Sequence, residues 1–344
     1  MKKKVSLSDV AKALGVSRTL VSMVLNNQGD VHGISPVTQE KVRAKAKELN
    51  YKPNSIARGL RTGKSNTIGL IVTDISNSFY AKIARRIEDK ASKLGYNLIF
   101  CSSDESATRE EELIQMLRGR QVDGLIVATT FQDQSVLQEL VKEEYPFVLI
   151  DRHIPSLSSN YVVVDNYSSS KVAVERLIAN QHTEIGLLTI SPSHLSTIQD
   201  RERGYRDALE GQSIAINAQN ICEIPFDDLH HQVEVALQKI LKRPNPVTAL
   251  YATNNSIAKA CLEHLVTMGV KIPEEVALLS FDDIDVFKFC YPPVTAVAQP
   301  INEIGDQAVS ILLDMIQGSK NAVTAHRQVV LPADLIIRKS CGSA

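Results

Sequence analysis

Short apolar runs alternate with amphipathic stretches of helix length through most of this chain after residue 65. The runs are Thr67 to Val72, Asn97 to Cys101, Gly124 to Ala128, Phe147 to Ile150, Tyr161 to Val164, Glu184 to Ile190, Ala249 to Ala252 and Val276 to Phe281. Such runs are typical of strands in parallel sheets, which are buried on both faces. The pattern therefore predicts an α/β body built from repeated strand–helix–strand units.

The segment between the first two runs shows one such unit. Ile83, Ile87, Ala91 and Leu94 are spaced by four, four and three residues, which places them on one face of a helix. A helix of this length can connect two parallel strands. Repetition of the unit predicts doubly wound parallel sheets. Residues 66–344 exceed one comfortable hydrophobic core, so we expect two lobes.

Polar residues follow three of the predicted strands. They are Asp74 to Ser78, with Phe79 and Tyr80, then Asp151 and Arg152, and then Asp282 and Asp283. In open α/β sheets a ligand binds beyond the carboxyl ends of the strands, so these positions are candidates for a binding site. Each has a structural alternative, since Phe79 is compatible with the core and Asp282 with a helix cap.

Two short amphipathic helices are predicted near the start of the chain, on either side of Gly15. The first has a cap at Ser6 with Asp9 and buries Leu7, Val10, Ala11 and Leu14. The second has a cap at Ser17, buries Leu20, Val21, Val24 and Leu25, and leaves Arg18, Thr19, Ser22 and Met23 nearer its exposed side.

A third helix is predicted to begin at Ser35, where a capping residue precedes a proline at the first helical position. It directs Val42, Ala46 and Leu49 inward. The three helices predict a compact all-α head. Their periodicity is compatible with a DNA-binding helix-turn-helix and also with a plain helical bundle.

Charge is distributed unevenly along the chain. Up to Lys64 there are 13 Lys and Arg residues against 4 Asp and Glu residues, a balance of +9, and the remainder holds 25 against 35, a balance of −10. A basic head on an acidic body fits nucleic-acid binding, although a short basic segment is often only a solvated surface.

The cysteines indicate neither a disulfide framework nor a zinc site. Cys101, Cys222, Cys261, Cys290 and Cys341 are odd in number, far apart and without a CxxC pair. The chain shows no apolar run of membrane-spanning length, and no apolar segment of a signal peptide follows the lysines at positions 2–4. We therefore expect a cytoplasmic protein without a metal, a cofactor or membrane attachment.

The residues of the head narrow the alternatives. They include Val5-Ser6-Leu7-Ser8-Asp9-Val10-Ala11, Gly15-Val16-Ser17, Val21-Ser22, Leu25-Asn26, Lys41-Val42 and Leu49-Asn50-Tyr51-Lys52-Pro53-Asn54. This set resembles the LacI/GalR family of bacterial repressors. The resemblance implies a helix-turn-helix DNA-binding domain over residues 1–52 and a hinge helix or linker over residues 53–65.

The resemblance also implies a set of DNA contacts. Arg18 and Thr19 match the principal base-contacting positions of the family, and Ser17 and Ser22 match phosphate contacts. Further implied contacts are Ser6, Asn26, Tyr51, Asn54 and Ala57, with Leu60 at the position of a leucine that wedges between minor-groove base steps. Because arginine bonds guanine at two points, we expect Arg18 to dominate specificity.

The resemblance continues through the body. It is found in Asp74-Ile75-Ser76-Asn77-Ser78-Phe79-Tyr80, Val122-Asp123-Gly124, Asp165-Asn166, Arg201 with Gly204, Ser280-Phe281-Asp282-Asp283 and Leu335-Ile336-Ile337-Arg338. It implies a periplasmic-binding-protein-like fold over residues 66–344, with the chain crossing between two lobes near residues 165, 298 and 327. The positions implied to face a small-molecule effector are Asn77, Phe79, Tyr80, Arg201, Phe226, Asn254 and Asp282.

This set of residue types favours a sugar as the effector. An aromatic ring stacks on the apolar face of a sugar, while arginine, asparagine and aspartate bond its hydroxyls. A nucleobase uses similar groups and stays open as an alternative. The implied function is that of a sequence-specific transcriptional regulator, a repressor by resemblance, whose affinity for operator DNA is controlled allosterically. We expect a homodimer, because two recognition helices contact half-sites one turn of DNA apart.

Several positions depart from the family pattern. Met23 stands where many members carry arginine, and the stretch from Asn27 to Val37 is longer than usual. Asn255 stands where many members have aspartate, and Ser169 and Ser170 stand where a glycine is usual. The operator sequence and the effector can therefore not be transferred from relatives.

Some members of the family bind a phosphorylated carrier protein through basic residues on the helix that follows a Gln-Pro segment. In this chain the corresponding helix has Ser310 and Asp314. A carboxylate repels a phosphoprotein, so we expect no phosphocarrier partner.

Three other functions share part of this pattern. An enzyme is disfavoured because the sequence has no HExxH, GxSxG or GxGxxG motif. A secreted solute-binding protein would share the body but has no use for a basic head. An architectural DNA binder would show a steep salt dependence with little sequence preference.

Overall fold

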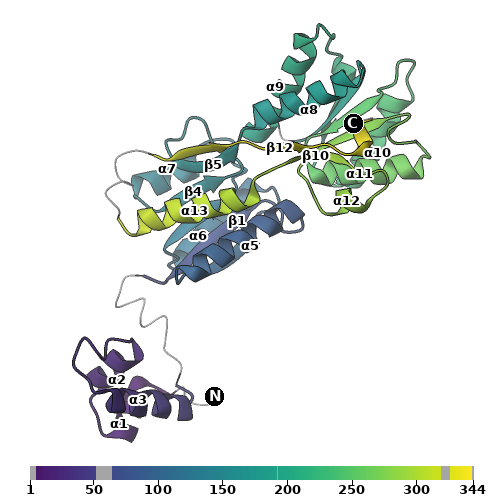
Figure 1. The fold of residues 1–344 in the computed structure, drawn as a ribbon. Helices are drawn as coiled ribbons and strands as arrows, with labels where there is room; N and C mark the ends of the chain where they lie inside the picture. Colours follow the sequence, from purple (N-terminus) through teal and green to yellow (C-terminus); the bar gives the residue numbers. More distant parts are fainter. Residues whose placement is uncertain (1–4, 52–63, 192, 319–325, 343–344) are drawn as a thin grey trace. The chain divides into compact units, whose positions relative to one another are not determined.

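The computed structural model describes residues 5–51, 64–191, 193–318 and 326–342 (Figure 1). The chain divides into two compact units, a head of residues 1–65 and a body of residues 66–344. Among the described residues, no helix combines the length and the apolar character that a membrane span requires.

The head contains the three expected helices. They are α1 (Leu7–Leu14), α2 (Arg18–Leu25) and α3 (Pro36–Glu48). Ser6 and Asp9 form a reciprocal capping box at the start of α1, and Gly15 ends it in the left-handed conformation with φ of 67°. Val10, Val21 and Val42, one from each helix, meet in a small buried core.

The long connection before α3 is ordered by one buried side chain. Gln39 of α3 donates hydrogen bonds to the Asp30 carboxylate at 2.7 Å and to the Ile34 carbonyl at 2.9 Å. A Cβ atom on Gly29 would lie 2.5 Å from the end of the Gln39 side chain, which would then have to move from this position. The loop is therefore fixed onto α3, which begins at Pro36 and includes Val37.

The described residues of the body form two six-stranded sheets. The first has the order β11-β5-β4-β3-β1-β2, with β1 (Thr67–Val72), β2 (Asn97–Ser102), β3 (Gly124–Val127), β4 (Phe147–Ile150), β5 (Asn160–Val164) and β11 (Gln328–Leu331). The second has the order β12-β10-β9-β8-β6-β7, with β6 (Ile185–Ile190), β7 (Ile221–Ile224), β8 (Ala249–Ala252), β9 (Ala277–Phe281), β10 (Thr295–Ala298) and β12 (Asp334–Ile336). All the strand pairs are parallel except β10 with β12. All eight predicted runs form strands, and β7, β10, β11 and β12 are additional to them.

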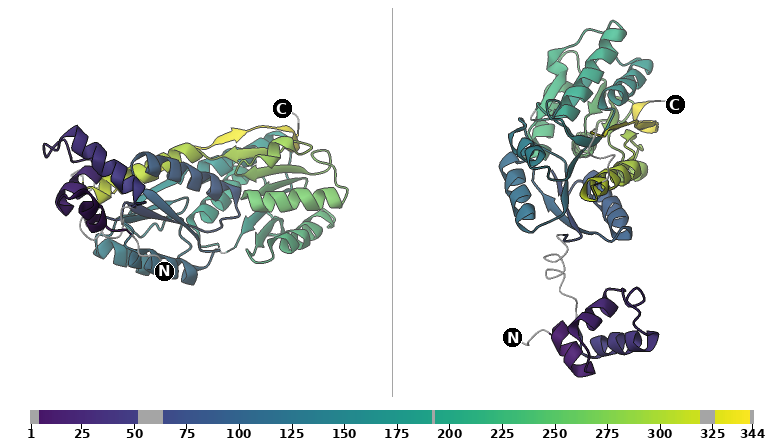
Figure 2. Two further views of the ribbon diagram at one scale, coloured as in Figure 1. Left: turned by 90° about the horizontal axis from the view of Figure 1, so that it is seen from below. Right: turned by 90° about the vertical axis from the view of Figure 1, so that its left-hand side faces the viewer.

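Helices cover both faces of each sheet (Figure 2). On the first sheet, α5 (Ser78–Lys93) and α13 (Ile301–Ile316) cover one face, and α6 (Ala107–Gly119) and α7 (Ser135–Lys142) cover the other. On the second sheet, α10 (Leu229–Leu241) and α11 (Asn255–Thr267) cover one face, and α8 (Asn166–Ala179) and α9 (Ser196–Gly211) cover the other. The short helix α12 (Val286–Phe289) follows β9. Each sheet with its helices forms one lobe, and this doubly wound α/β body agrees with the predicted fold class.

In the described parts of the body, the chain passes between the lobes three times. It leaves the first sheet after β5 to form α8, and it returns after β10 to form α13. The third passage lies between β11 and β12, at residues 332–333. This passage comes later than the expected position near residue 327, because β11 continues the first sheet as far as Leu331.

The contact between α8 and α9 explains one glycine of the sequence pattern. A Cβ atom on Gly204 would lie 2.5 Å from the Tyr167 carbonyl oxygen and 2.9 Å from the Ser170 Cβ atom. The Ser170 hydroxyl is hydrogen-bonded to the Tyr251 hydroxyl at 2.6 Å. Serine therefore fits in α8 because the facing residue of α9 has no side chain.

Candidate functional site

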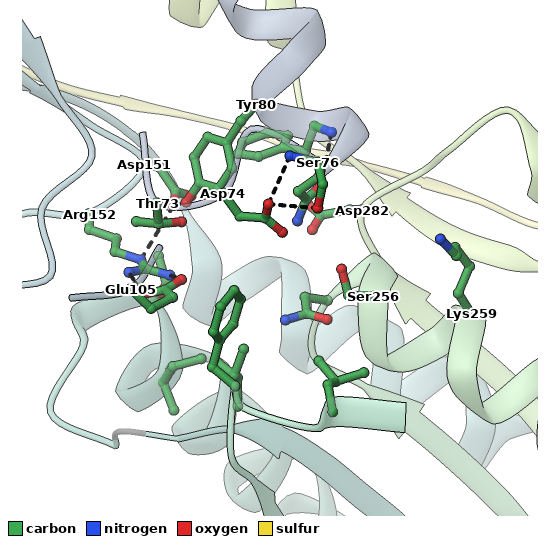
Figure 3. A pocket seen from close by; sticks show the side chains of 18 of the residues that line it. Thr73, Asp74, Ser76, Tyr80, Glu105, Asp151, Arg152, Ser256, Lys259 and Asp282 are labelled. Carbon is green, nitrogen blue, oxygen red and sulfur yellow. Dashed lines mark hydrogen bonds and ion pairs between the residues drawn. The ribbon is translucent and has the colours of Figure 1, made fainter. Parts of the chain in front are cut away.

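A cavity of about 260 Å³ is lined by residues of both lobes, and most of them follow the carboxyl ends of strands (Figure 3). The structure brings together around it all seven residues that the sequence placed at an effector site: Asn77, Phe79, Tyr80, Arg201, Phe226, Asn254 and Asp282. The cavity thus lies at the position where an open α/β fold binds a small ligand, beyond the carboxyl ends of the strands.

The start of α5 supplies the first wall of the cavity. Asn77 caps this helix, its side-chain oxygen accepting a hydrogen bond from the Phe79 amide at 3.0 Å. The cap places Phe79 and Tyr80 in the first turn, where their rings pack edge to face with centroids 5.1 Å apart. Both rings are buried, so Phe79 belongs to the core and to the cavity wall at once.

Tyr80 is held in place by its hydroxyl group. It donates a hydrogen bond to the Asp151 carboxylate at 2.7 Å. Burial, followed by the nearby charge of Asp151, raises the pKa of Tyr80 well above its usual value. Tyr80 therefore stays protonated and remains a hydrogen-bond donor at physiological pH.

A buried ion pair of Arg152 and Glu105 lies beside Tyr80. Arg152 was among the candidate positions that follow the strands, whereas Glu105 was not predicted. The Arg152 guanidinium donates to both oxygens of Glu105, each at 2.7 Å, and these side chains are 7% and 8% exposed. Burial opposes ionisation of Glu105, but the charge of Arg152 and the hydrogen bonds from Arg152 and Thr73 together outweigh it and lower the pKa of Glu105. Glu105 lies in a loop and carries no distinguishing pattern in the sequence.

The second lobe supplies Arg201 from α9. Its Nε atom donates to the Asn166 side-chain oxygen at 2.8 Å, and another nitrogen donates to the Thr253 carbonyl at 2.6 Å. The guanidinium also lies 3.6 Å from the centre of the Phe281 ring. These contacts fix one edge of Arg201 to the protein while the residue still lines the cavity.

Asp282 follows β9 in a left-handed backbone conformation with φ of 72°. It accepts a hydrogen bond from Gln299 at 2.6 Å and another from the Asn255 side chain at 3.4 Å. Burial raises the pKa of Asp282, and the Arg201 charge opposes that rise. The helix cap considered for Asp282 is wrong, because α12 begins after Asp285.

Asn254 and Phe226 complete the predicted set. Asn254 caps α11, its side-chain oxygen accepting from the Ile257 amide at 2.8 Å. Phe226 is partly buried against the core of the second lobe. On the opposite side of the cavity from the Arg152 pair, Lys259 also lines it (Figure 3). Lys259 carried no signal in the sequence, since exposed lysines on helices are common.

Polar contacts join the two lobes near the cavity. Asn77 bonds to Asn255 at 2.9 Å, and Lys82 forms an ion pair with Asp285 at 3.1 Å. The His153 amide also donates to the Ser196 hydroxyl at 3.2 Å, and the His194 ring is hydrogen-bonded to the Thr130 carbonyl at 3.2 Å. A change at the cavity can therefore alter how the lobes meet.

In the head, Arg18 and Thr19 lie exposed in the first turn of α2. Ser17 accepts a hydrogen bond from the Leu20 amide at 3.1 Å, and the Ser22 hydroxyl accepts one from Asn26 at 3.3 Å. Ser6 caps α1, and Tyr51 is partly buried beside the core of the head. Asn54, Ala57 and Leu60 lie outside the described residues.

A helical head with exposed polar side chains on its second helix, joined to a two-lobed body with a small-molecule cavity, defines a ligand-responsive DNA-binding regulator. Known proteins agree with this class. Residues 6–54 match the model of bacterial regulatory proteins of the lacI family, and residues 174–341 match a periplasmic binding protein-like domain.

Relatives align over nearly the whole chain. The HTH-type transcriptional regulator DegA of Bacillus subtilis is 33% identical over 98% of both chains. The ribose operon repressor of the same organism is 34% identical over 97% of this chain and 98% of its own. The repressor PurR of Photobacterium profundum is 31% identical over 97% and 98%. This chain therefore belongs to the lacI family of bacterial regulatory proteins and is a DNA-binding transcriptional regulator.

Solved structures share the fold. A complex of the transcriptional regulator CelR with cellobiose aligns with 98% of this chain and all of its own, at a TM-score of 0.72 and 28% identity. The lac repressor dimer bound to operator aligns with 99% of this chain and all of its own, at a TM-score of 0.86 and 24% identity. Its identity is low, so this second likeness supports the fold alone.

Proposed function

We propose that this chain is a cytoplasmic, homodimeric repressor whose affinity for its operator is controlled by a sugar bound in the cavity between the lobes. The observation that carries the proposal is the composition of the cavity wall. Phe79 and Phe226 offer apolar surface, while Arg201, Asn254 and Asp282 offer hydrogen-bonding groups from different elements. A polyol with one apolar face and several hydroxyls matches this arrangement.

The charges around the cavity favour a neutral ligand. Arg152 is paired with Glu105, and Arg201 lies close enough to Asp282 to oppose its protonation. Each of these buried cations thus has an acidic neighbour, so binding does not require a charge on the ligand. The aromatic geometry points the same way. Phe79 and Tyr80 meet at 62°, so these two rings do not form a parallel pair between which a flat base could stack.

A nucleobase is the second candidate. The relatives include the repressor PurR as well as a ribose operon repressor, at similar sequence identity, so the relatives do not decide between the two classes of ligand. In a thermal-shift panel of monosaccharides, disaccharides and purine bases, we expect at least one sugar to stabilise the protein. If a purine base stabilises the protein and no sugar does, the effector is a nucleobase and not a sugar.

The head is proposed to contact the operator through α2. Arg18 and Thr19 bond base edges in the major groove, and Ser6, Ser17, Ser22, Asn26 and Tyr51 contact the sugar-phosphate backbone. Asn54, Ala57 and Leu60 are proposed to contact the minor groove at the operator centre. The Ser17 and Ser22 hydroxyls already accept one hydrogen bond each, and a hydroxyl can still donate to phosphate.

An exposed apolar patch on the second lobe supports the homodimer. The patch consists of Val286, Phe289 and Tyr291, and the last two are 84% and 91% exposed. Exposed aromatic residues in one short segment mark an interaction surface. In a twofold dimer, the same patch of a second copy of the chain can pack against this one. Analytical ultracentrifugation of the Phe289→Ser variant tests this surface by measuring the proportion of dimer. The control is Val266→Ser, which changes an exposed residue of α11 outside the patch.

A phosphocarrier partner stays disfavoured. Asp314 forms an ion pair with Arg327 at 2.7 Å, and the Ser310 hydroxyl donates to the Asp306 carbonyl. This part of α13 thus presents the Asp314 carboxylate, and the adjacent cation of Arg327 is already paired with it. Such a surface repels a phosphoryl group and does not attract it. Tight binding of a phosphocarrier protein in a titration would reverse this conclusion.

A further inference from the structure

Asn255 lies behind the cavity wall, between Asn254 and Ser256, which both line the cavity. It is the first residue of α11 and is 3% exposed. Its side-chain nitrogen lies 2.9 Å from the Asn77 side-chain oxygen and 3.4 Å from an Asp282 carboxylate oxygen. One amide group therefore bonds a residue of the first lobe and a residue of the second lobe.

The direction of these hydrogen bonds is fixed by their neighbours. The Asn77 oxygen also accepts from the Phe79 amide as the cap of α5, so the oxygen and not the nitrogen of Asn77 faces Asn255. The Asp282 carboxylate accepts a hydrogen bond from Gln299, and its other oxygen is likewise an acceptor for Asn255. Asn255 must therefore donate to both partners, which an amide nitrogen with two hydrogens can do.

We infer that Asn255 is a positioning residue for the effector site, whose amide holds Asn77 of the first lobe against Asp282 of the second and so favours closure of the cleft. The inference rests on the proposed function only in assigning Asn77 and Asp282 to effector binding. The geometry of the bridge itself involves no ligand.

An aspartate at position 255 has the same shape as asparagine, but it would turn the attraction to these two partners into repulsion. The Asn255→Asp variant places a carboxylate against two acceptors, the Asn77 oxygen and the Asp282 carboxylate. The other charged groups around Asp282 are Arg201 from α9, which attracts negative charge, and Asp151 from the first lobe, which repels it. Two carboxylates this close cannot both ionise without cost, so closure in this variant depends on pH.

The test measures the separation of the lobes in the full chain without added ligand. Spin labels are attached to cysteines introduced at the exposed positions Glu112 on α6 and Lys239 on α10, with Cys101 and Cys290 replaced by serine. Pulsed electron paramagnetic resonance then gives the distribution of distances between the labels. We expect one short distance in the otherwise unaltered chain, which corresponds to closed lobes.

Two variants remove the contact between Asn77 and Asn255, one by changing the residue of the second lobe and the other by changing the residue of the first lobe. Asn255→Asp should shift most of the population to a longer distance at about pH 8 and restore part of the short distance at about pH 5, where one carboxyl takes up a proton. Asn77→Ser keeps a capping hydroxyl but is too short to reach Asn255, so it should lengthen the distance at both pH values. Asn77→Ser leaves α11 unaltered. If the Asn255→Asp variant does not fold, the distance measured in Asn77→Ser still tests the role of the contact between the lobes.

Asn217→Asp is the matched control, because it makes the same chemical change at a helix cap in the second lobe away from the cavity. It should leave the distance distribution unaltered at both pH values. The inference is overturned if Asn255→Asp or Asn77→Ser keeps the short distance throughout, or if the starting chain is already open. A negative sugar panel would overturn the proposed function and leave this measurement unaffected.

Discussion

Arg152 and Glu105 form a two-point ion pair that is almost completely buried at one side of the cavity, although the two residues lie 47 positions apart in the chain. Removal of one partner leaves an uncompensated buried charge, which is strongly destabilising. We expect Glu105→Gln to lower the free energy of unfolding by about 3 kcal/mol, as measured by urea denaturation.

The neighbouring residue gives a matched control for that variant. Asp104 pairs with Arg109 at 2.7 Å, but both side chains are about half exposed. Exposed ion pairs contribute little, so Asp104→Asn should remain close to the unaltered protein. Equal effects of the two substitutions would show that burial of the Arg152 pair has no energetic consequence.

Arg18 should determine the preference of the head among DNA sequences. Its exposed position at the start of α2 suits a two-point bond to guanine, which discriminates against other bases by roughly 1–3 kcal/mol. Binding selection from a randomised duplex library should therefore give a flatter preference for Arg18→Ala. The same experiment with Lys12→Ala, which removes a positive charge from α1, should keep the ranking of sequences. An unaltered ranking in Arg18→Ala would contradict the assignment.

Leu60 should bend the operator if it enters the minor groove. An apolar side chain inserted between base steps unstacks them and kinks the duplex, at a cost that wider contact repays. Leu60→Ala should weaken operator binding and reduce the bend in a circular-permutation gel. A bend of unaltered size would exclude the wedge.

Glu110 should make stability depend on pH near neutrality. It accepts hydrogen bonds from the amide and the hydroxyl of Thr130, both at 2.6 Å, but burial outweighs them and raises its pKa to about 7. A carboxyl with a raised pKa in the folded state contributes stability at low pH, and this contribution is lost as the pH rises from its unfolded value toward about 7.

Glu110→Gln mimics the protonated carboxyl at every pH. Relative to the unaltered protein, this variant should gain stability between about pH 4.5 and about pH 7, by roughly 3 kcal/mol over that window. The measurement is the difference in urea midpoint as a function of pH. Glu111→Gln changes the adjacent exposed residue and should show no such trend, so parallel curves for the two variants would refute the role of burial.

The sequence predicted those parts of the fold that local patterns determine. The three helices of the head were recognised from their caps and apolar spacing, and eight strands were recognised because they are apolar runs buried on both faces. The strand β11 escaped this pattern because it is only partly buried, and β12 because it has three residues. Both lie at the outer edges of their sheets, where neighbours on one side are missing.

The cavity was predictable only in part. Residues that follow strands could be proposed from topology, and the family pattern supplied Arg201, Phe226 and Asn254. Glu105 could not be found in this way, because its role depends on Arg152 reaching it across the first lobe. The bridge between Asn77 and Asn255 joins residues 178 positions apart, and no local pattern contains that information.

The central claim is that a ligand in the cavity controls the affinity of the head for DNA. The most direct measurement is a titration of operator DNA with the full chain, with and without the sugar that the thermal-shift panel identifies. The affinity of the unaltered protein should change by about 5- to 150-fold, whereas Asp282→Asn should bind the operator normally and not respond. If Asp282→Asn responds to the sugar as fully as the unaltered protein does, the ligand acts elsewhere and the account is wrong.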